Sequence, residues 1–262
     1  MFQLYRKLIA ASIRAQMQYK LNFLTTAVTT GLIMVIDFFI LSAILYRFDH
    51  VKGWNLYEVG MLYGLSSVAM SLYRMFAPEI HDFERYIVHG EFDQLLVRPV
   101  PPLVLLLTRN LELGRIGGIV QGLAVLLVSI YGLYQLGCEL WGILLYIPVV
   151  LVCGPVIFFS ISLCTATVAF WSSQLKELQT FTIYAPANAS HYPNSLYPGW
   201  LKLLFFSVIP IAYVNYMPML YLLQKGGEWY YLLLTPLVAG VALLIAYRFW
   251  TLGIRHYHST GS

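Results

Sequence analysis

Long apolar runs, separated by short polar breaks, dominate the chain. Runs long enough to cross a bilayer, which takes about 20 residues, cover residues 23–45, 56–77, 116–136, 141–170 and 229–250. Inside lipid every backbone N–H and C=O group needs a partner within the protein, so apolar runs of this length predict helices. The pattern predicts an all-α integral membrane protein.

One more span is expected between residues 171 and 228, and its position is open. Residues 199–223 are the more apolar stretch, although Pro210 and Pro218 interrupt it. Residues 176–192 compete with it and are more polar. Either choice gives six spans and places both ends of the chain on the same side of the membrane.

The first 22 residues carry a different pattern. Apolar residues recur at helical spacing on one face of residues 2–20, and the basic residues lie largely elsewhere. A helix that lies in the membrane interface has this pattern. We therefore expect residues 1–22 to form an interfacial helix before the first span.

Residues 78–102, hereafter the polar segment, form the main polar interruption. They hold five of the twelve acidic residues, in a chain with only 11% charged residues. Apolar residues recur there at helical spacing, with Phe83, Tyr86 and Ile87 before Gly90 and with Phe92, Leu95 and Leu96 after it. The pattern indicates an amphipathic docking surface, and a solvated loop with incidental apolar residues is the alternative.

Basic residues indicate the orientation of the chain. Twelve of them fall on one side of the predicted spans, where they flank the polar segment and both ends of the chain. The other side has only four, namely Arg47, Lys52, Lys202 and Lys225. Because basic residues concentrate in cytoplasmic loops, the polar segment and both termini are expected in the cytoplasm.

Composition excludes a large soluble domain. Hydrophobic residues make up 59% of the 262, well above the roughly 45–50% of soluble proteins. We expect residues 1–262 to form a single transmembrane domain. The net charge of +4 is mild, and the basic residues cluster beside the spans, so a nucleic-acid partner is not expected.

Common catalytic and nucleotide-binding signatures are absent. The sequence contains no G-x-x-x-x-G-K-[ST] loop, so ATP-driven work would need a partner that hydrolyses ATP. It also lacks H-E-x-x-H, D-D-x-x-D and G-x-S-x-G, which mark common membrane enzymes. The histidines and the three cysteines show no metal-ligand spacing, so no metal is expected.

Asp37 lies inside the first predicted span, where a carboxylate is costly to desolvate and is by default a functional candidate. It either lines a polar path or is satisfied by a neighbouring helix or subunit. Helix rise places Arg74 at a different depth, so a direct pair is not expected. Arg74 is instead expected to reach the cytoplasmic surface.

A charged stripe precedes the third predicted span. Arg109, Glu112 and Arg115 recur every three residues and so share a helical face. The stripe is either a gating network of ion pairs or a solvated face at the membrane surface.

The order of these elements resembles a known family. Residues Gly90-Glu-Phe-Asp-Gln-Leu-Leu-Val-Arg-Pro99 follow two spans and precede four more. Two further stretches, Tyr192-Pro-Asn-Ser-Leu-Tyr-Pro198 and Ile209-Pro-Ile-Ala-Tyr-Val-Asn-Tyr-Met-Pro218, stand before the last span. Together they resemble the membrane (permease) subunit of bacterial type-2 ATP-binding-cassette export systems, over nearly the whole chain.

This resemblance implies that residues 83–98 form a coupling helix that sits in a groove of a separate cytosolic ATPase subunit. It makes Phe92, Leu95 and Leu96 the apolar anchors, while Gly90 and Pro99 delimit the part that acts as a rigid lever. The remaining coupling residues that it implies are Phe83, Glu84, Arg85, Ile87, Glu91, Asp93 and Arg98. Residues 172–177 would form a second, smaller contact with the ATPase.

The resemblance also implies a fifth span at about residues 178–192 and two short re-entrant helices over residues 197–223. The re-entrant part and its approach contain Tyr192, Pro193, Tyr197, Pro198, Pro210 and Pro218. A polar fifth span would line the pathway, so the candidate lining residues are Asp37, Thr180, Tyr184 and Asn188.

The same family architecture implies partners for this chain. Six spans are half of such a transporter, so a second membrane subunit, either a related permease or a second copy, is expected. ATP and Mg²⁺ would bind to the ATPase subunit, and this chain would bind no cofactor. The expected location of the chain is the bacterial cytoplasmic membrane. An ATP-independent channel or ion-coupled carrier remains the alternative, followed by an integral-membrane enzyme.

Overall fold

The computed structural model describes residues 10, 13, 14, 16, 18, 20–48, 53–172 and 175–257. The elements that these residues form are helices, as the sequence predicts. The interfacial helix expected over residues 1–22 lies largely outside the described residues. In the described part of the chain, four helices are long and apolar enough to cross a membrane, or five if one bent pair is a single span.

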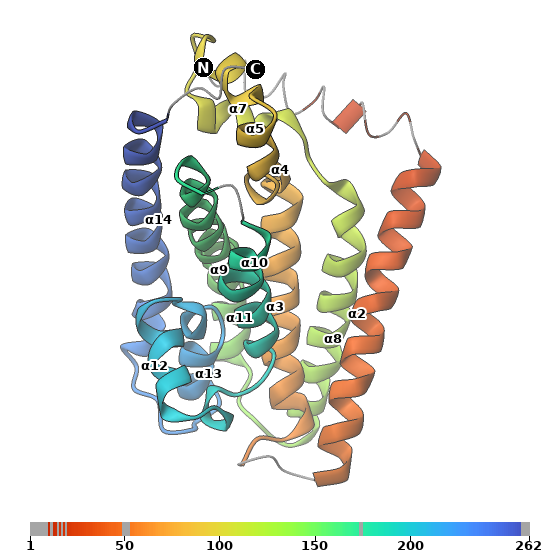
Figure 1. The fold of residues 1–262 in the computed structure, drawn as a ribbon. Coiled ribbons are helices and arrows are strands. Elements are labelled where there is room, and N and C mark those ends of the chain that lie inside the picture. Colours follow the sequence, from red (N-terminus) through yellow and green to blue (C-terminus); the bar gives the residue numbers. More distant parts are fainter. Residues whose placement is uncertain are drawn as a thin grey trace.

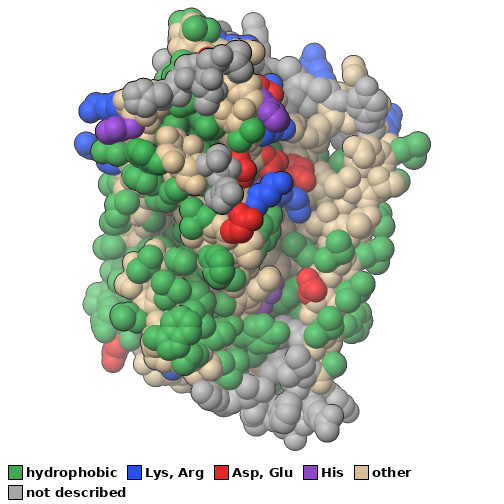
Figure 2. All heavy atoms as spheres, in the orientation of Figure 1, with side chains coloured by type: hydrophobic (Ala, Val, Ile, Leu, Met, Phe, Trp, Pro, Cys, Tyr) green, Lys and Arg blue, Asp and Glu red, His purple; other side chains and the backbone are tan. Residues whose placement is uncertain are grey.

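Four long helices frame a bundle (Figure 1), namely α2 (Lys20–Phe48), α8 (Ile116–Gln135), α9 (Trp141–Thr167) and α14 (Tyr231–Arg255). They coincide with the first, third, fourth and last predicted spans, so those four predictions are confirmed. Large apolar side chains cover much of the flank of the bundle (Figure 2), as membrane helices require. The chain is a multi-pass, all-α membrane protein.

The predicted second span, α3 (Leu56–Phe76), is largely covered by protein. It packs against α8 and α9 and also contacts α2. Polar residues such as Ser66, Ser67 and Arg74 make it less apolar than the four long helices, so length and composition alone do not mark it as a span. Because its surface is buried against neighbours, α3 needs no apolar exterior. The six-span count therefore stays a prediction.

Glycines let α2, α3 and α8 approach closely. A Cβ atom on Gly64 of α3 would lie 2.9 Å from the carbonyl oxygen of Gly122 on α8. One on Gly117 of α8 would lie 1.8 Å from the carbonyl oxygen of Ala27 on α2. Small residues serve this role between membrane helices because close packing, rather than hydrophobic burial, holds such helices together.

The start of α3 is fixed by a capping box. The Asn55 side chain accepts a hydrogen bond from the Glu58 N–H at 2.9 Å, and the Glu58 carboxylate accepts one from the Asn55 N–H at 2.8 Å. Glu58 also forms an ion pair with Lys225 at 2.8 Å. Lys225 and the start of α3 therefore lie at the same end of the bundle, as the charge distribution predicts.

The chain turns where α3 ends. The polar segment contains α4 (Pro78–His81), α5 (Glu84–Val88) and α6 (Glu91–Leu96) and leads into α7 (Pro102–Arg109). The expectation of one helix over residues 83–98 is wrong, because Gly90 adopts a left-handed φ of 67° and separates α5 from α6. These short helices cap one end of the bundle, hereafter the polar end (Figure 1).

A second group of short helices follows α9 and η2 (Val168–Phe170). α10 (Lys176–Gln179), η3 (Thr180–Tyr184) and α11 (Ala185–Ala189) form one helical run, in which η3 is a π-helical turn. The run packs against α9. It corresponds to the polar candidate for the fifth span.

The more apolar candidate, residues 199–223, does not form a straight helix. After η4 (Asn194–Leu196) it contains α12 (Gly199–Ser207), η5 (Ile211–Tyr213) and α13 (Tyr216–Leu222). The two halves, Gly199–Ser207 and Ile211–Leu222, meet at 74°, with Pro210 in the break. Both α12 and α13 lie at the end of the bundle opposite the polar end (Figure 1).

The first residues of α2 and the last residues of α14 both lie at the polar end. α2 begins there and α14 finishes there (Figure 1). In Figure 2, charged side chains also gather toward this end of the molecule. This arrangement agrees with the expectation that both ends of the chain lie on one side.

Candidate functional site

An aromatic cluster fastens the polar segment to the bundle. Phe92 of α6 lies 5.3 Å, between ring centroids, from Phe170 at the end of η2 and 5.0 Å from Tyr257 beyond α14. Phe83 lies 5.4 Å from Phe170 and 5.0 Å from Trp250 of α14. Edge-to-face contacts of this kind add to the burial of the rings. The polar segment is therefore packed onto the ends of α9 and α14.

This packing changes the role of the expected anchors. Phe92 and Leu95 are only 0% and 3% exposed, so both side chains point into the protein itself and offer no surface to a partner. Phe83 and Ile87 are buried with them, whereas Leu96 is 39% exposed. The helical periodicity identified a real apolar face, but most of that face packs against the rest of this chain and is not available to a partner. The exposed apolar side chains of the segment are Val88, Leu96 and Val97.

Several of the expected polar contacts are also made within the chain. Arg85 pairs with Glu79 at 2.5 Å, and the Tyr86 hydroxyl donates to the same carboxylate at 2.6 Å. The guanidinium groups of Arg85 and Arg109 lie 5.0 and 5.1 Å from the centre of the Tyr86 ring. Burial, with Glu79 beside it, raises the pKa of Tyr86 to about 12, so the phenol stays protonated.

The charged stripe before the third span divides into two ion-pair groups. Arg109 pairs with Glu91 of the polar segment at 3.4 Å. Glu112 instead pairs with Arg115 at 3.0 Å and with Arg74 of α3 at 3.8 Å. The stripe is thus neither a single network nor a simple solvated face, because an irregular backbone between α7 and η1 (Leu113–Arg115) separates its members.

The remaining coupling candidates occupy the surface of the polar end. The Glu84 carboxylate accepts a hydrogen bond from the Leu175 N–H at 3.3 Å, which brings residues 175–177 beside the polar segment; residues 173 and 174 of the expected second contact lie outside the described residues. Burial, together with neighbouring Asp93, raises the pKa of Tyr257 to about 12. Arg98 and Pro99 are exposed.

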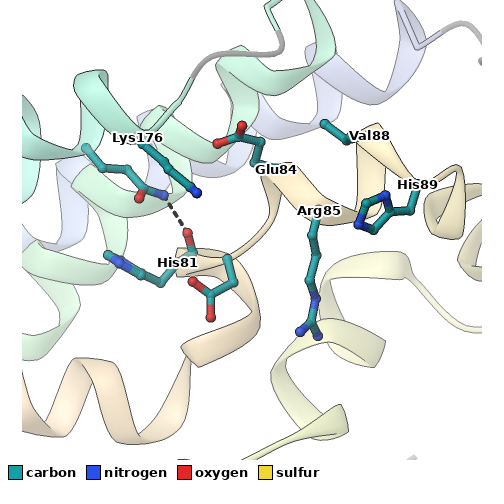
Figure 3. Close-up of a pocket in the computed structure, with 8 residues that line it drawn as sticks. His81, Glu84, Arg85, Val88, His89 and Lys176 are labelled. Carbon is teal, nitrogen blue, oxygen red and sulfur yellow. Dashed lines mark hydrogen bonds between the residues drawn. The ribbon is translucent and has the colours of Figure 1, made fainter.

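A pocket of about 360 Å³ lies between α5 and α10 (Figure 3). Lys176 and Glu84 stand on opposite walls, and their charged groups point into the space between them (Figure 3). The Gln179 amide donates to the carbonyl oxygen of His81 at 2.5 Å and closes the floor. The two segments expected to touch a partner therefore frame one continuous surface.

A second, polar cavity of about 180 Å³ lies within the bundle, between α2, α3 and α11. Asp37, Tyr184 and Asn188, three of the four expected pathway residues, line it. Thr180 does not line it; this residue is exposed, and its hydroxyl donates to the Lys176 carbonyl at 3.1 Å. A regular helix would place residues 180 and 184 on one face, but the π turn widens the helix between them.

Other lining residues of the cavity were missed by sequence reasoning, namely Met34, Tyr63, Ser67, Met70, Ser71, Arg74, Arg115, Ala187 and His191. Ser67, Ser71 and Arg74 recur at spacings of four and three on α3, a signal that could have found them. His191 stands alone in the sequence and carried no such signal. Arg74 and Asp37 line the same cavity, although helix rise predicts different depths for them, and Arg74 forms an ion pair with Glu112.

The expected re-entrant residues surround the bent pair of helices. Pro198 directly precedes α12, and Pro218 sits in the first turn of α13. The Tyr197 hydroxyl donates to the Ala189 carbonyl at 2.9 Å, while Tyr192 packs in the core and Pro193 precedes η4. Sequence reasoning missed Asn215, which is fully buried and donates to the carbonyl oxygens of Leu62 and Ser190 at 2.7 and 2.8 Å.

Among the described residues, no cluster of three or more histidine, cysteine, aspartate or glutamate side chains is arranged to hold a metal ion. A protein-family model described as an ABC-2 family transporter protein matches residues 32–261. This range includes the polar segment, all of the cavity-lining residues and the bent pair of helices. No curated protein and no solved structure matches the chain.

Proposed function

The chain belongs to the ABC-2 family of transporter proteins, and we propose that it is the permease subunit that forms half of the pathway of an ATP-driven exporter. The family match over nearly the whole chain carries this proposal. A polar cavity inside an apolar helical bundle supports it, because polar groups at membrane depth are costly unless they serve a path or an interface.

ATP hydrolysis is assigned to a separate subunit. The sequence has no P-loop, so the partner would bind ATP and Mg²⁺, and this chain would bind no cofactor. The docking surface would be the exposed side of the polar segment, with Val88, Leu96 and Val97 as apolar contacts. The pocket between α5 and α10 and the neighbouring residues 172–177 would complete it.

Coupling would then follow from packing. ATP closes two ATPase subunits, and a polar segment docked on them moves with them. The aromatic cluster of Phe83, Phe92, Phe170 and Trp250 fastens this segment to α9 and α14, so these helices would be displaced together with it. Close-packed interiors transmit such a displacement because they do not compress.

A second membrane subunit is part of the proposal. The apolar window of α2 over Lys20–Ile40 contains no buried residue, and Asp37 on this helix is exposed. A lipid-facing carboxylate would be expensive. A related permease or a second copy of this chain, placed against α2, would cover Asp37 and close the cavity.

For the fifth crossing we favour residues 176–189, with α12 and α13 as a re-entrant pair on the outer side. The 74° bend and the placement of both α12 and α13 at the end opposite the polar end support this choice. Buried Asn215 ties the start of α13 to α3 and to the chain after α11. The excess of basic residues at this end supports a cytoplasmic location for the polar end and both termini, and the resemblance described above implies a bacterial membrane.

The docking surface can be tested with charge substitutions at two exposed apolar residues. Leu96→Glu combined with Val97→Glu should abolish co-purification of the chain with a P-loop ATPase and leave membrane insertion intact. Neither side chain is buried, so folding should be retained. Leu136→Glu, at an exposed residue beyond the far end of α8, is the matched control and should retain the ATPase. Unchanged co-purification of the double variant would rule out this docking surface.

A further inference from the structure

A line of hydrogen bonds leads out of the polar cavity toward the polar segment. It starts at Arg74 of α3, whose guanidinium donates to the Tyr184 hydroxyl of η3 at 2.8 Å. Both side chains line the cavity. The Tyr184 hydroxyl lies 2.7 Å from Nε2 of His81 on α4. The side chain of His81 alone therefore lies between a cavity-lining residue and the backbone of the polar segment.

The line continues beyond His81 into α9. Nδ1 of His81 lies 3.3 Å from the Tyr73 hydroxyl, and that hydroxyl donates to Ser162. His81 is only 4% exposed, so its ring has few other partners available. The five side chains join α3, α4, η3 and α9 through hydrogen bonds alone.

Chemistry sets one direction for every proton along this line. The Tyr73 hydroxyl gives its single hydrogen to Ser162, so the hydrogen between Tyr73 and His81 must come from Nδ1. Nε2 of a neutral ring then accepts from Tyr184, whose oxygen accepts from Arg74. Burial, followed by the charges of Arg74 and Arg115, lowers the pKa of His81 to about 3, so the ring is neutral near pH 7. Nδ1 then carries the hydrogen and donates to Tyr73, which donates onward to Ser162. The bond from Tyr73 to Ser162 thus selects the tautomer of His81, and every bond along the line has one direction.

His81 also borders the pocket at the polar end, although the residue itself is buried. It is one of the residues that line the space between α5 and α10, and the Gln179 amide of α10 donates to its carbonyl oxygen (Figure 3). Any displacement of α4 or α10 therefore acts directly on the histidine. The same histidine is bonded to a residue of the cavity wall.

The helix that carries Tyr184 is suited to two positions. η3 is a π-helical turn, Thr180–Tyr184, inside the run from α10 to α11. Such turns are rare and are frequent at functional sites. Conversion of the turn to regular α-helix would shift the register by one residue, which rotates a side chain by about 100°. Tyr184 would then leave both Arg74 and His81.

We propose that His81 and Tyr184 are positioning residues that transmit a displacement of the polar segment to Arg74 in the polar cavity. When α4 moves, the bond between His81 and Tyr184 breaks and the π turn relaxes. The Arg74 guanidinium then loses its hydrogen bond to Tyr184 and keeps its ion pair with Glu112. It reorients in the cavity, where it faces the transported molecule. This inference rests on the proposed coupling to an ATPase.

The test uses the whole complex with its ATPase, in a background in which Cys138, Cys153 and Cys164 are replaced by alanine. Asn188→Cys reports from the cavity wall, and the rate of its reaction with a small methanethiosulfonate reagent is measured without nucleotide and with ATP plus vanadate. The rate should differ several-fold between the two conditions. Tyr184→Phe should abolish this difference while ATP hydrolysis and assembly persist, and His81→Phe should do the same. Tyr146→Phe, whose hydroxyl donates to the Leu232 carbonyl, is the matched control and should preserve it.

The outcomes separate this inference from the function on which it rests. A Tyr184→Phe complex that keeps the nucleotide-dependent change in rate overturns the role of Tyr184 and leaves the proposed function standing. If the complex with unsubstituted Tyr184 and His81 shows no such change, the proposed function is contradicted. The proposed roles of His81 and Tyr184 are then contradicted as well.

Discussion

Individual side chains in the polar segment face inward more often than its sequence indicates. Phe92 and Leu95 have the spacing of a docking face, yet they pack in the protein's own core. The partners that bury Phe92, such as Phe170 and Trp250, are far away in the sequence. Periodicity identifies a face, but only the fold determines what covers it. The sequence pattern did not indicate a role for His81 either, because its hydrogen-bond partners come from three other elements.

Burial of His81 predicts a specific sensitivity to acid. The folded protein holds its pKa at about 3, whereas an unfolded histidine titrates near 6.5. Between these values the unfolded state binds the extra proton, so stability falls as pH falls below about 6.5. At pH 5 the loss amounts to about 2 kcal/mol relative to pH 7.5.

The measurement is the thermal midpoint of the detergent-solubilised protein at pH 7.5 and at pH 5. The decrease between the two should be smaller for His81→Gln than for the wild-type protein, whatever the midpoints at pH 7.5. His89→Gln, at an exposed histidine in the same pocket, should keep the wild-type decrease. Equal decreases for wild type and His81→Gln would mean that His81 is not held neutral.

Short helical elements, rather than the long ones, distinguish this fold. Length and apolar character predict α2, α8, α9 and α14 well, because a membrane-spanning helix leaves a long, uniform signal. The π turn at Thr180–Tyr184 and the bend at Pro210 break that uniformity. Simple hydropathy therefore favoured residues 199–223 as the fifth span, whereas the structure divides this stretch into two halves that meet at 74°.

The left-handed turn at Gly90, between α5 and α6, predicts a loss of stability when this glycine is replaced. Its φ of 67° lies in the left-handed region, which costs a residue with a Cβ about 1–2 kcal/mol. Gly90→Ala should lower the free energy of unfolding by that amount. It should also weaken association with the ATPase, because α5 and α6 would be held at a different angle.

The matched control for Gly90→Ala is Gly199→Ala. Gly199 opens α12, has no neighbouring atom within 4 Å of an added Cβ, and shows no positive φ. Thermal midpoints of the two variants in the same detergent give the comparison. A Gly90→Ala protein as stable as Gly199→Ala would show that the left-handed turn is not required.

At the scale of the whole molecule, the parts form a line from surface to cavity. The polar segment and α10 frame a pocket at the polar end, the aromatic cluster attaches that segment to α9 and α14, and His81 and Tyr184 connect it to the polar cavity. Sequence reasoning reached the class of protein and three of the cavity residues. It could not reach the connections between them, because each joins residues about 80 or more positions apart, such as Phe92 with Phe170 and His81 with Tyr184.

The most direct test of the proposed function is to identify what binds the wild-type chain. The full chain, purified from its cell membrane in mild detergent, should carry a cytosolic P-loop ATPase in stoichiometric amount, detected by mass spectrometry of the intact complex. A second permease, or a second copy of this chain, should be present with it. Recovery of a folded, monodisperse chain with no P-loop protein attached would contradict the proposal that a separate ATPase drives it.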